Sequence, residues 1–292
     1  MNWVVLASCS ALLSAGAAVA QKRTLFRMHA LEFSFLVSAA VLALSLFVPL
    51  TTDVLALPTR ALVVLGVKSL LGGVAFLLVM MALERNPISR ALPLLGLTPA
   101  VTAVLAQLLL HESLRPVQWF GLALMLAGTW ALEERSRETA SNTASDRFGS
   151  GRHRLMAGAL LLFACSAVAD RLLLNGMRVP PNVVLFNQQV VYCLLFGGLL
   201  LVRRTSFAEV ARRGREQWQL IGAIAVLTLG YRFFQLQATR VGPVALVLAV
   251  KRTSILYATF FGGRLFAERR LGRRLAGAAL IVAAGFLFLG RE

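Results

Sequence analysis

Residues 87–112 read PISRALPLLGLTPAVTAVLAQLLLHE, and residues 243–268 read PVALVLAVKRTSILYATFFGGRLFAE. Each stretch begins with proline, continues as an apolar run long enough for a membrane-spanning helix, and ends with glutamate. The offset between them is 243 − 87 = 156 positions, and Gly121 and Gly277 match at the same offset. A fixed offset between two parts of one chain indicates an internal duplication.

The same offset aligns two short matches nearer the start of each half. It superposes the CSA tripeptide at 9–11 on the CSA tripeptide at 165–167, and Gly66 on Gly222. We therefore expect one alignment to run through both halves without a gap. The repeat unit is then about half of the chain.

The composition of the chain indicates a membrane protein. Of the 292 residues, 58% are hydrophobic and 15% are charged, and the mean hydropathy is +0.74. A water-soluble domain of this size could not cover so much apolar surface. Ten segments have the length of about 17 to 25 mostly apolar residues that a spanning helix needs, some at the short end. They are 3–21, 30–50, 60–83, 88–110, 116–133, 154–176, 183–202, 217–239, 244–263 and 272–290.

One long polar, serine-rich stretch, EERSRETASNTASDRFGSGRHR, separates the fifth span from the sixth. We predict a first five-helix repeat over 1–133, a cytoplasmic linker over 134–153 and a second five-helix repeat over 154–292. Five spans is an odd number, so the second copy enters the bilayer from the opposite side. The predicted fold class is an all-α integral membrane protein with ten transmembrane helices in two inverted five-helix repeats.

The positive charges predict the orientation. Loops after the odd-numbered spans carry 3, 2, 5, 5 and 5 Lys and Arg residues, whereas loops after spans two, four, six and eight carry one each. By the positive-inside rule the odd-numbered loops are cytoplasmic and both termini lie outside. No basic residue precedes the first apolar stretch, which favours a retained helix over a cleaved signal peptide. We expect a multi-pass protein of a bacterial cytoplasmic (inner) membrane.

Several function classes find no support in the residues. The net charge of +17 comes from arginines that punctuate apolar spans rather than from one basic soluble face, so we predict no nucleic-acid partner. The chain contains no HExxH, GxSxG or Walker motif, and its three histidines lie in loops. The three cysteines lack the spacing of a metal site. We therefore predict no catalytic residue, no metal and no cofactor.

The chain resembles the drug/metabolite transporter superfamily, specifically its ten-helix EamA-type members. The residues that carry the resemblance are SRALPLLGLTPAVTAVLAQLLLHESLRPVQWFGLALMLAG in the first half and GPVALVLAVKRTSILYATFFGGRLFAERRLGRRLAGAALIVAAG in the second. Each contains a helix, a turn with glutamate, and a helix rich in small residues. The resemblance implies a secondary transporter that moves a small molecule across the bilayer by alternating access.

Ionisable residues inside the spans are the candidate binding residues, because a charge at the bilayer centre costs on the order of 3 kcal/mol and is usually functional. The candidate substrate-binding residues are Lys68, Asp170, Asn187, Tyr231, Arg232, Gln235, Lys251, Arg252, Ser254 and Tyr257. Their positive groups outnumber the one carboxylate, which predicts an anionic, carboxylate- or phosphate-bearing solute. Resemblance to the plastid phosphate translocators, which have an adjacent Lys-Arg pair in span nine, implies anion binding by Lys251 and Arg252.

Alternatives stay open at this stage. Asp170 either carries a proton or forms a structural ion pair. The protein could instead be a magnesium-type cation carrier or an amine or drug efflux carrier of the same superfamily, or an intramembrane enzyme. Small residues on spans five and ten permit a homodimer. Glu112 and Glu268 are expected to begin the next helix, where a carboxylate suits the positive end of the helix dipole.

Overall fold

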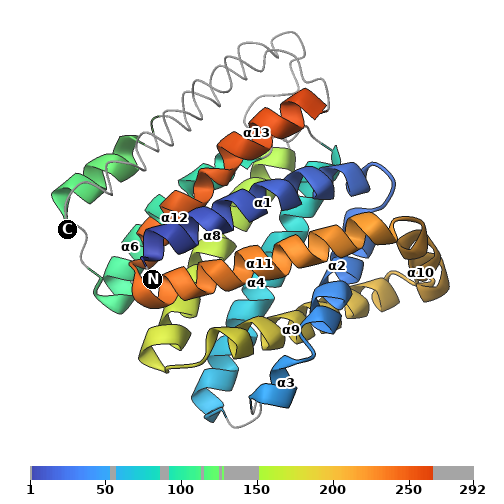
Figure 1. Cartoon of the computed structure of the whole chain (residues 1–292), viewed down its shortest axis with the longest axis horizontal. Helices are drawn as coiled ribbons and strands as arrows, with labels where there is room; N and C mark the ends of the chain where they lie inside the picture. Colours follow the sequence, from blue (N-terminus) through green and yellow to red (C-terminus); the bar gives the residue numbers. More distant parts are fainter. Residues whose placement is uncertain are drawn as a thin grey trace.

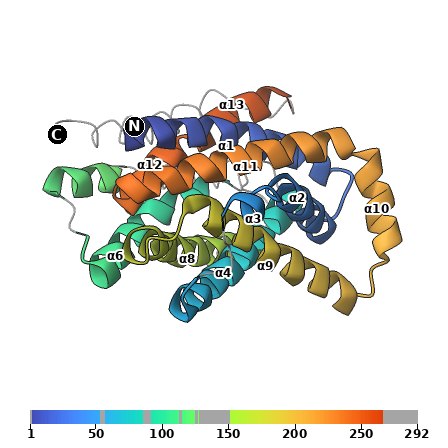
Figure 2. The ribbon, with the colours of Figure 1, turned by 60° about the horizontal axis from the view of Figure 1, so that its bottom comes forward.

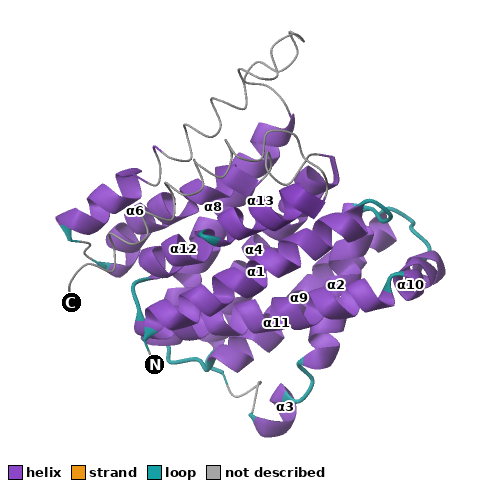
Figure 3. Cartoon of the chain, turned by 45° about the horizontal axis from the view of Figure 1, so that its top comes forward, coloured by secondary structure: helices purple, strands orange, loops and turns teal. Residues whose placement is uncertain are grey.

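The computed structural model describes residues 2–52, 57–85, 92–112, 115–124, 127 and 151–265. In these ranges all regular elements are helices and no strand occurs (Figure 3). Six helices within them are long and apolar enough to cross a membrane. They span Trp3–Leu25, Ala30–Leu50, Thr59–Arg85, Arg154–Gly176, Pro181–Val202 and Trp218–Val241. The chain is an all-helical integral membrane protein.

The first half begins with four helices. They are α1 (Trp3–Leu25), α2 (Ala30–Leu44), the short α3 (Val48–Thr51) and α4 (Thr59–Arg85). The predicted fourth span is divided into the 3₁₀ helix η1 (Leu92–Leu97) and α6 (Thr98–Leu110). Residues 116–124 are helical, and the rest of the predicted fifth span lies outside the described residues except for residue 127.

The second half has a longer helix than the first between its second and third spans. In chain order it comprises α8 (Gly151–Arg171), the π-helical turn η2 (Leu172–Gly176), α9 (Pro181–Val202), α10 (Phe207–Glu216), α11 (Trp218–Val241), α12 (Val244–Arg252) and α13 (Ser254–Leu265). This helix is α10, with 10 residues, where the described part of the first half has α3, with 4 residues. The predicted tenth span, 272–290, and most of the predicted linker lie outside the described residues.

Local chemistry explains several helix starts. Asn2 caps α1, because its side-chain oxygen accepts a hydrogen bond from the Val4 N–H at 3.0 Å. The first N–H of α2, at Ala30, donates instead to the Glu84 carboxylate at the end of α4, at 3.2 Å. Proline occupies the first position of α9, where a missing N–H costs nothing.

The helices form two layers that each contain helices from both halves. In Figure 2, α1 lies with α11, α12 and α13 in one layer, and α4 lies with α6, α8 and α9 in the other. Figure 1 shows α1 and α11 side by side across the molecule, from the N-terminus towards α10. α2 packs against both α9 and α11. The halves therefore interlock rather than sit apart.

The packing is paired in a regular way. α1 packs on α11 and α8 packs on α4, and these are the two most extensive helix contacts in the described part of the chain. α2 packs on α11 as α9 packs on α4. α12 and α13 pack on α1 as α6 and η1 pack on α8. Each of these contacts between the halves thus has a counterpart in which the two halves exchange roles.

The expectation of one gap-free alignment is wrong. α13 begins 254 − 98 = 156 positions after α6, but α9 begins only 181 − 30 = 151 after α2. The second half is longer between its second and third spans, because α10 lies there. The CSA match of 9–11 with 165–167 stays a prediction. Its two serines make similar contacts, because Ser10 donates to the Tyr231 carbonyl oxygen of α11 and Ser166 donates to the Lys68 carbonyl oxygen of α4.

Candidate functional site

The predicted ninth and fourth spans are both interrupted where they face each other. Lys251 and Arg252 are the last residues of α12, and the chain resumes as α13 at Ser254. In the first half η1 changes to α6 at Thr98, which is 156 positions before Ser254. Arg252 Nη2 donates to Thr98 Oγ1 at 3.0 Å, so the two interruptions face each other.

A buried ion pair connects the two halves next to this point. Lys68 Nζ of α4 lies 2.5 Å from Asp170 Oδ1 of α8, and the two side chains are 0% and 4% exposed. The same ammonium donates to Gln188 Oε1 of α9 at 2.7 Å. Ser166 of α8 donates to the Lys68 carbonyl oxygen at 3.1 Å. Three helices are thereby held around one lysine.

Arg232 of α11 extends the cluster. Its Nη2 lies 3.3 Å from Asp170 Oδ2 and 2.6 Å from Gln188 Oε1, and its Nη1 donates to Gln235 Oε1 at 3.1 Å. Gln235 Oε1 also accepts a hydrogen bond from Lys251 Nζ. The result is a continuous polar chain from the α4–α8 pair to the break in α12.

Lys251 has an aromatic neighbour as well as an amide. Its ammonium lies 4.6 Å from the centroid of the Tyr231 ring, a cation–π distance. Tyr231 is held in place because its carbonyl oxygen accepts a hydrogen bond from Ser10 of α1 at 2.8 Å. Both contacts of Lys251 are with neutral groups.

A cavity of about 140 Å³ lies among these residues. One part of its wall is polar and the other is apolar. The polar wall includes Thr98, Ser166, Asp170, Gln188, Tyr192, Tyr231, Arg232, Gln235, Lys251, Arg252 and Ser254. The apolar wall includes Ala17, Ala18, Val37, Phe76, Val79, Met80, Leu83, Leu95, Phe163, Ile255 and Ala258.

The charges on this wall do not balance. Asp170 is the one carboxylate among the described residues that line the cavity, and Lys68 and Arg232 already bind it. In the described part of the chain no carboxylate lies within 4.0 Å of the Lys251 or Arg252 nitrogens. Among the same residues, the buried Nε atoms of Arg232 and Arg252 have no hydrogen-bond partner. A bound anion could accept hydrogen bonds from these groups.

A second polar network closes the bundle at the end where α8 and α11 finish. Arg171 Nε lies 2.5 Å from Glu112 Oε1, and its Nη1 donates to the Thr239 carbonyl oxygen at 2.5 Å. Glu112 Oε2 accepts from the Val244 N–H, the first of α12, at 3.3 Å. Glu112 thus lies at a helix N-terminus, as expected for the dipole, but at that of α12 rather than the helix after residue 115.

The opposite end has a matching contact. Lys22, near the end of α1, is 5% exposed and donates from Nζ to the Leu83 carbonyl oxygen at 2.6 Å. Leu83 and Thr239 are 239 − 83 = 156 positions apart, and Lys22 and Arg171 are 171 − 22 = 149 apart. Each half therefore places a cation near the end of its first helix against a carbonyl oxygen near the end of its own third span.

The family of the chain can be identified from its first part. Residues 1–132 match the family model of the EamA-like transporter family. This match places the chain in the drug/metabolite transporter superfamily. The resemblance inferred from the sequence is confirmed, and a family of transporters fits the prediction that the chain is not an enzyme.

The fold of this drug/metabolite transporter also resembles a solved structure. One crystal structure of a protein matches it with a TM-score of 0.74 at 20% sequence identity, over 98% of this chain and 96% of that chain. At this identity the likeness shows the fold alone. No curated protein matches the chain.

The structure brings most of the predicted site residues of this transporter together. Asp170, Tyr231, Arg232, Gln235, Lys251, Arg252 and Ser254 line the cavity. Lys68 is fully buried behind the cavity wall and reaches it through Asp170. Tyr257 packs against the apolar core and Asn187 donates to the Val183 carbonyl oxygen of its own helix, and neither lines the cavity.

Sequence reasoning omitted several polar cavity residues from the predicted set, among them Gln188, Tyr192 and Thr98. Gln188 and Tyr192 are four positions apart on α9, so they share the helix face that points to the cavity, one position beyond Asn187. That spacing could have identified them. The sequence pattern around Thr98 does not identify it as a cavity residue, because its contact with Arg252 forms only when the two halves pack together.

Proposed function

We propose that this protein is a secondary transporter that moves a small anionic solute, bearing a carboxylate or a phosphate, across the membrane by alternating access. The observation that supports the anionic charge is the surplus of cations at the cavity. Lys251 and Arg252 meet neutral groups among the described residues, while Asp170 is occupied by two other cations. An anion that enters would neutralise part of this charge.

The paired packing supports the inverted-repeat, ten-helix arrangement that this mechanism uses. The contacts of α1 with α11 and of α8 with α4 are counterparts, and the breaks at Thr98 and Ser254 fall at equivalent positions. In transporters built from inverted repeats, discontinuous helices meet near the bilayer midplane and hold the substrate. The cavity lies against both breaks.

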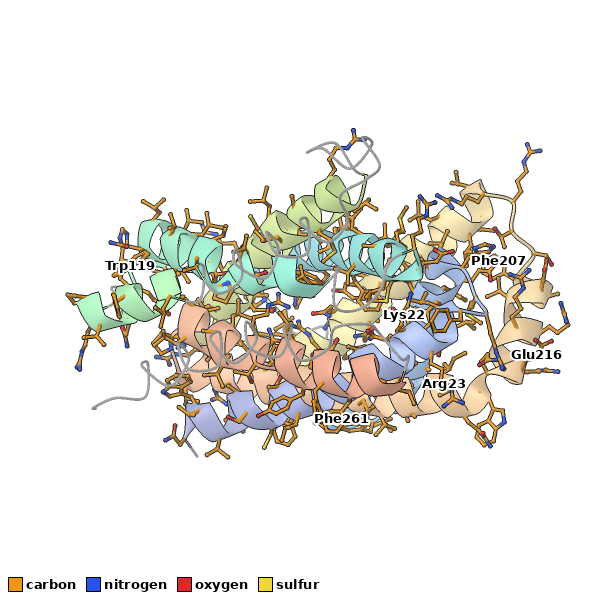
Figure 4. All side chains as sticks on the ribbon, turned by 90° about the horizontal axis from the view of Figure 1, so that it is seen from above. Lys22, Arg23, Trp119, Phe207, Glu216 and Phe261 are labelled. Carbon is orange, nitrogen blue, oxygen red and sulfur yellow. The ribbon has the colours of Figure 1, made fainter. Side chains whose placement is uncertain are left out.

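The ends of the helices support the proposed orientation. Figure 4 places Trp119 at one end of the bundle and Phe207 and Glu216 at the other. Near the Phe207 end lie Arg23, Arg27, Arg85, Arg203, Arg204, Arg212, Arg213 and Arg215, whereas Arg60, Arg115, Arg171, Arg178 and Arg240 lie near the Trp119 end. The positive-inside rule then makes the Phe207 end cytoplasmic and leaves the N-terminus outside.

The first experiment identifies the charge of the ligand. Purified protein is heated with organic acids, inorganic phosphate, phosphorylated metabolites, amino acids and amines, and stabilisation is recorded. A ligand at 100 times its Kd raises the unfolding free energy by about 2.7 kcal/mol, which is readily measured. We expect stabilisation by anions. Stabilisation by amines alone would contradict the proposal.

The second experiment tests Lys251. Lys251→Ala is expected to abolish uptake of the stabilising anion into proteoliposomes, while Lys251→Arg retains part of it because the positive charge remains. The control is Arg212→Ala, which removes an exposed cation that does not line the cavity. Wild-type uptake by Lys251→Ala would remove Lys251 from the site.

A further inference from the structure

The cavity has a polar and an apolar part that lie along one direction. Residues 72–83 of α4 line it, a length of about 16 Å at a rise of 1.5 Å per residue. Gly72 lies beside Tyr192 Oη and Ser166 Oγ, within the polar part. Phe76, Val79, Met80 and Leu83 follow towards the end of α4, and Gln21 is a polar residue that also lines the cavity near this end, since the next residue, Lys22, binds the Leu83 carbonyl oxygen. A ligand that fills the cavity therefore has a polar end and an apolar end.

The size of the cavity limits the apolar end. Its volume of about 140 Å³ is close to that of a cavity of about 150 Å³ that accommodates benzene in another protein. The apolar wall contains two phenyl rings and several aliphatic side chains, which favour a single ring or a branched aliphatic group. A long chain or a fused ring system exceeds this space.

The polar end accepts an anion but offers little to an ammonium. Asp170 is the carboxylate that an ammonium would seek, and its two oxygens already accept from Lys68 at 2.5 Å and Arg232 at 3.3 Å. An added ammonium would displace one of these cations and would lie close to the others. Like charges at such distances repel strongly in a site with little water.

From these observations we infer that the substrate is a small acid with a branched aliphatic or single-ring body and no ammonium group, and that the site discriminates against amino acids of the same shape. This inference rests on the proposed function, since it concerns the same cavity. The acid group meets Lys251 and Arg252, and the apolar body lies against Phe76, Met80 and Ile255. Asp170 acts here as a specificity-determining residue. Because Lys68 and Arg232 already bind both of its oxygens, no carboxylate among the described residues of the cavity is left to bind the ammonium group of an amino acid.

The test uses four probes that differ by one group. 4-Methylpentanoate has the acid and the branched body, leucine adds an ammonium, 3-methylbutylamine lacks the acid, and propanoate lacks the body. Equilibrium binding to the full-length purified protein is measured by titration calorimetry. We expect 4-methylpentanoate to bind at least tenfold more tightly than each of the other three.

A variant isolates the apolar part. Ala18→Leu adds a larger side chain at the apolar wall, and we expect it to weaken 4-methylpentanoate binding several-fold while leaving propanoate unchanged. Retained thermal stability shows that the variant is folded. Ala40→Leu, at a partly buried position outside the cavity lining, is the control.

The outcomes separate this inference from the proposed function. Equal binding of leucine and 4-methylpentanoate, or preferred binding of propanoate or phosphate, overturns the inference while the anion transporter stands. Preferred binding of 3-methylbutylamine overturns both. Binding of 4-methylpentanoate that Lys251→Ala leaves unchanged places the acid elsewhere and also overturns the inference.

Discussion

Asp170 binds two buried cations at once, and this makes its replacement the most informative single change. Asp170→Asn keeps the shape of the side chain but leaves Lys68, 0% exposed, and Arg232, 14% exposed, without a carboxylate among the described residues. Breaking a buried ion pair by removing one partner costs about 3 to 5 kcal/mol. Lys68→Met removes one cation and leaves the pair of Asp170 with Arg232, so we expect it to cost less.

The assay is thermal unfolding of the purified protein in detergent. With about 2 to 4 °C per kcal/mol for chains of 150 to 250 residues, Asp170→Asn should lower Tm by roughly 10 °C. Glu216→Gln is the control, because it breaks an exposed pair with Arg212 whose side chains are 56% and 66% exposed, worth about 0 to 1 kcal/mol. A larger loss for Lys68→Met than for Asp170→Asn would refute the reasoning.

Two further predictions concern the packing of the two halves. Gly72→Ala places a Cβ 2.6 Å from Tyr192 Oη, so we expect overpacking to cost about 1 to 3 kcal/mol in unfolding experiments, whereas Gly66→Ala meets nothing within 4 Å and should stabilise α4 by up to about 1 kcal/mol. Equal effects at both glycines would contradict this. Glu112→Gln removes the charge that binds Arg171, and we expect Tm to fall by a few degrees, for a loss of about 1 kcal/mol at a half-buried pair. An unchanged Tm would mean that water screens the pair.

The membrane class and the positions of the spans could be predicted from the sequence, because apolar length is a strong and local signal. The six long helices fall on predicted spans. The break at Thr98 lies beside Pro99 and two positions after Gly96, residue types that usually mark an interrupted helix, so the sequence carries a signal for it. The break at Ser254 has no proline or glycine beside it and could not be predicted. The gap-free alignment failed at α2 and α9, which begin 151 rather than 156 positions apart, because apolar helices of different length leave no local signal of an insertion.

The site residues that could be predicted from the sequence are the charged ones, because a charge inside a membrane costs free energy. Lys68, Asp170, Arg232 and Lys251 stand out in apolar runs because each must find a partner or a polar cavity in a membrane. Which cation binds Asp170 is a property of the fold, since α4, α8 and α11 meet only after packing. Asn187 shows the limit of the method. A neutral amide can donate a hydrogen bond to a carbonyl oxygen of its own helix, as Asn187 does to Val183, so an amide in a span does not indicate a binding site.

The matched contacts of Lys22 and Arg171 have a consequence for how a cargo could leave. The two hydrogen bonds lie at opposite ends of the bundle and have no residue in common. If the bundle opens at one end only when the hydrogen bond there breaks, each opening is controlled by its own cation. A substitution that removes one of these hydrogen bonds should then increase the fraction of molecules open to one side of the membrane, without changing which solute binds.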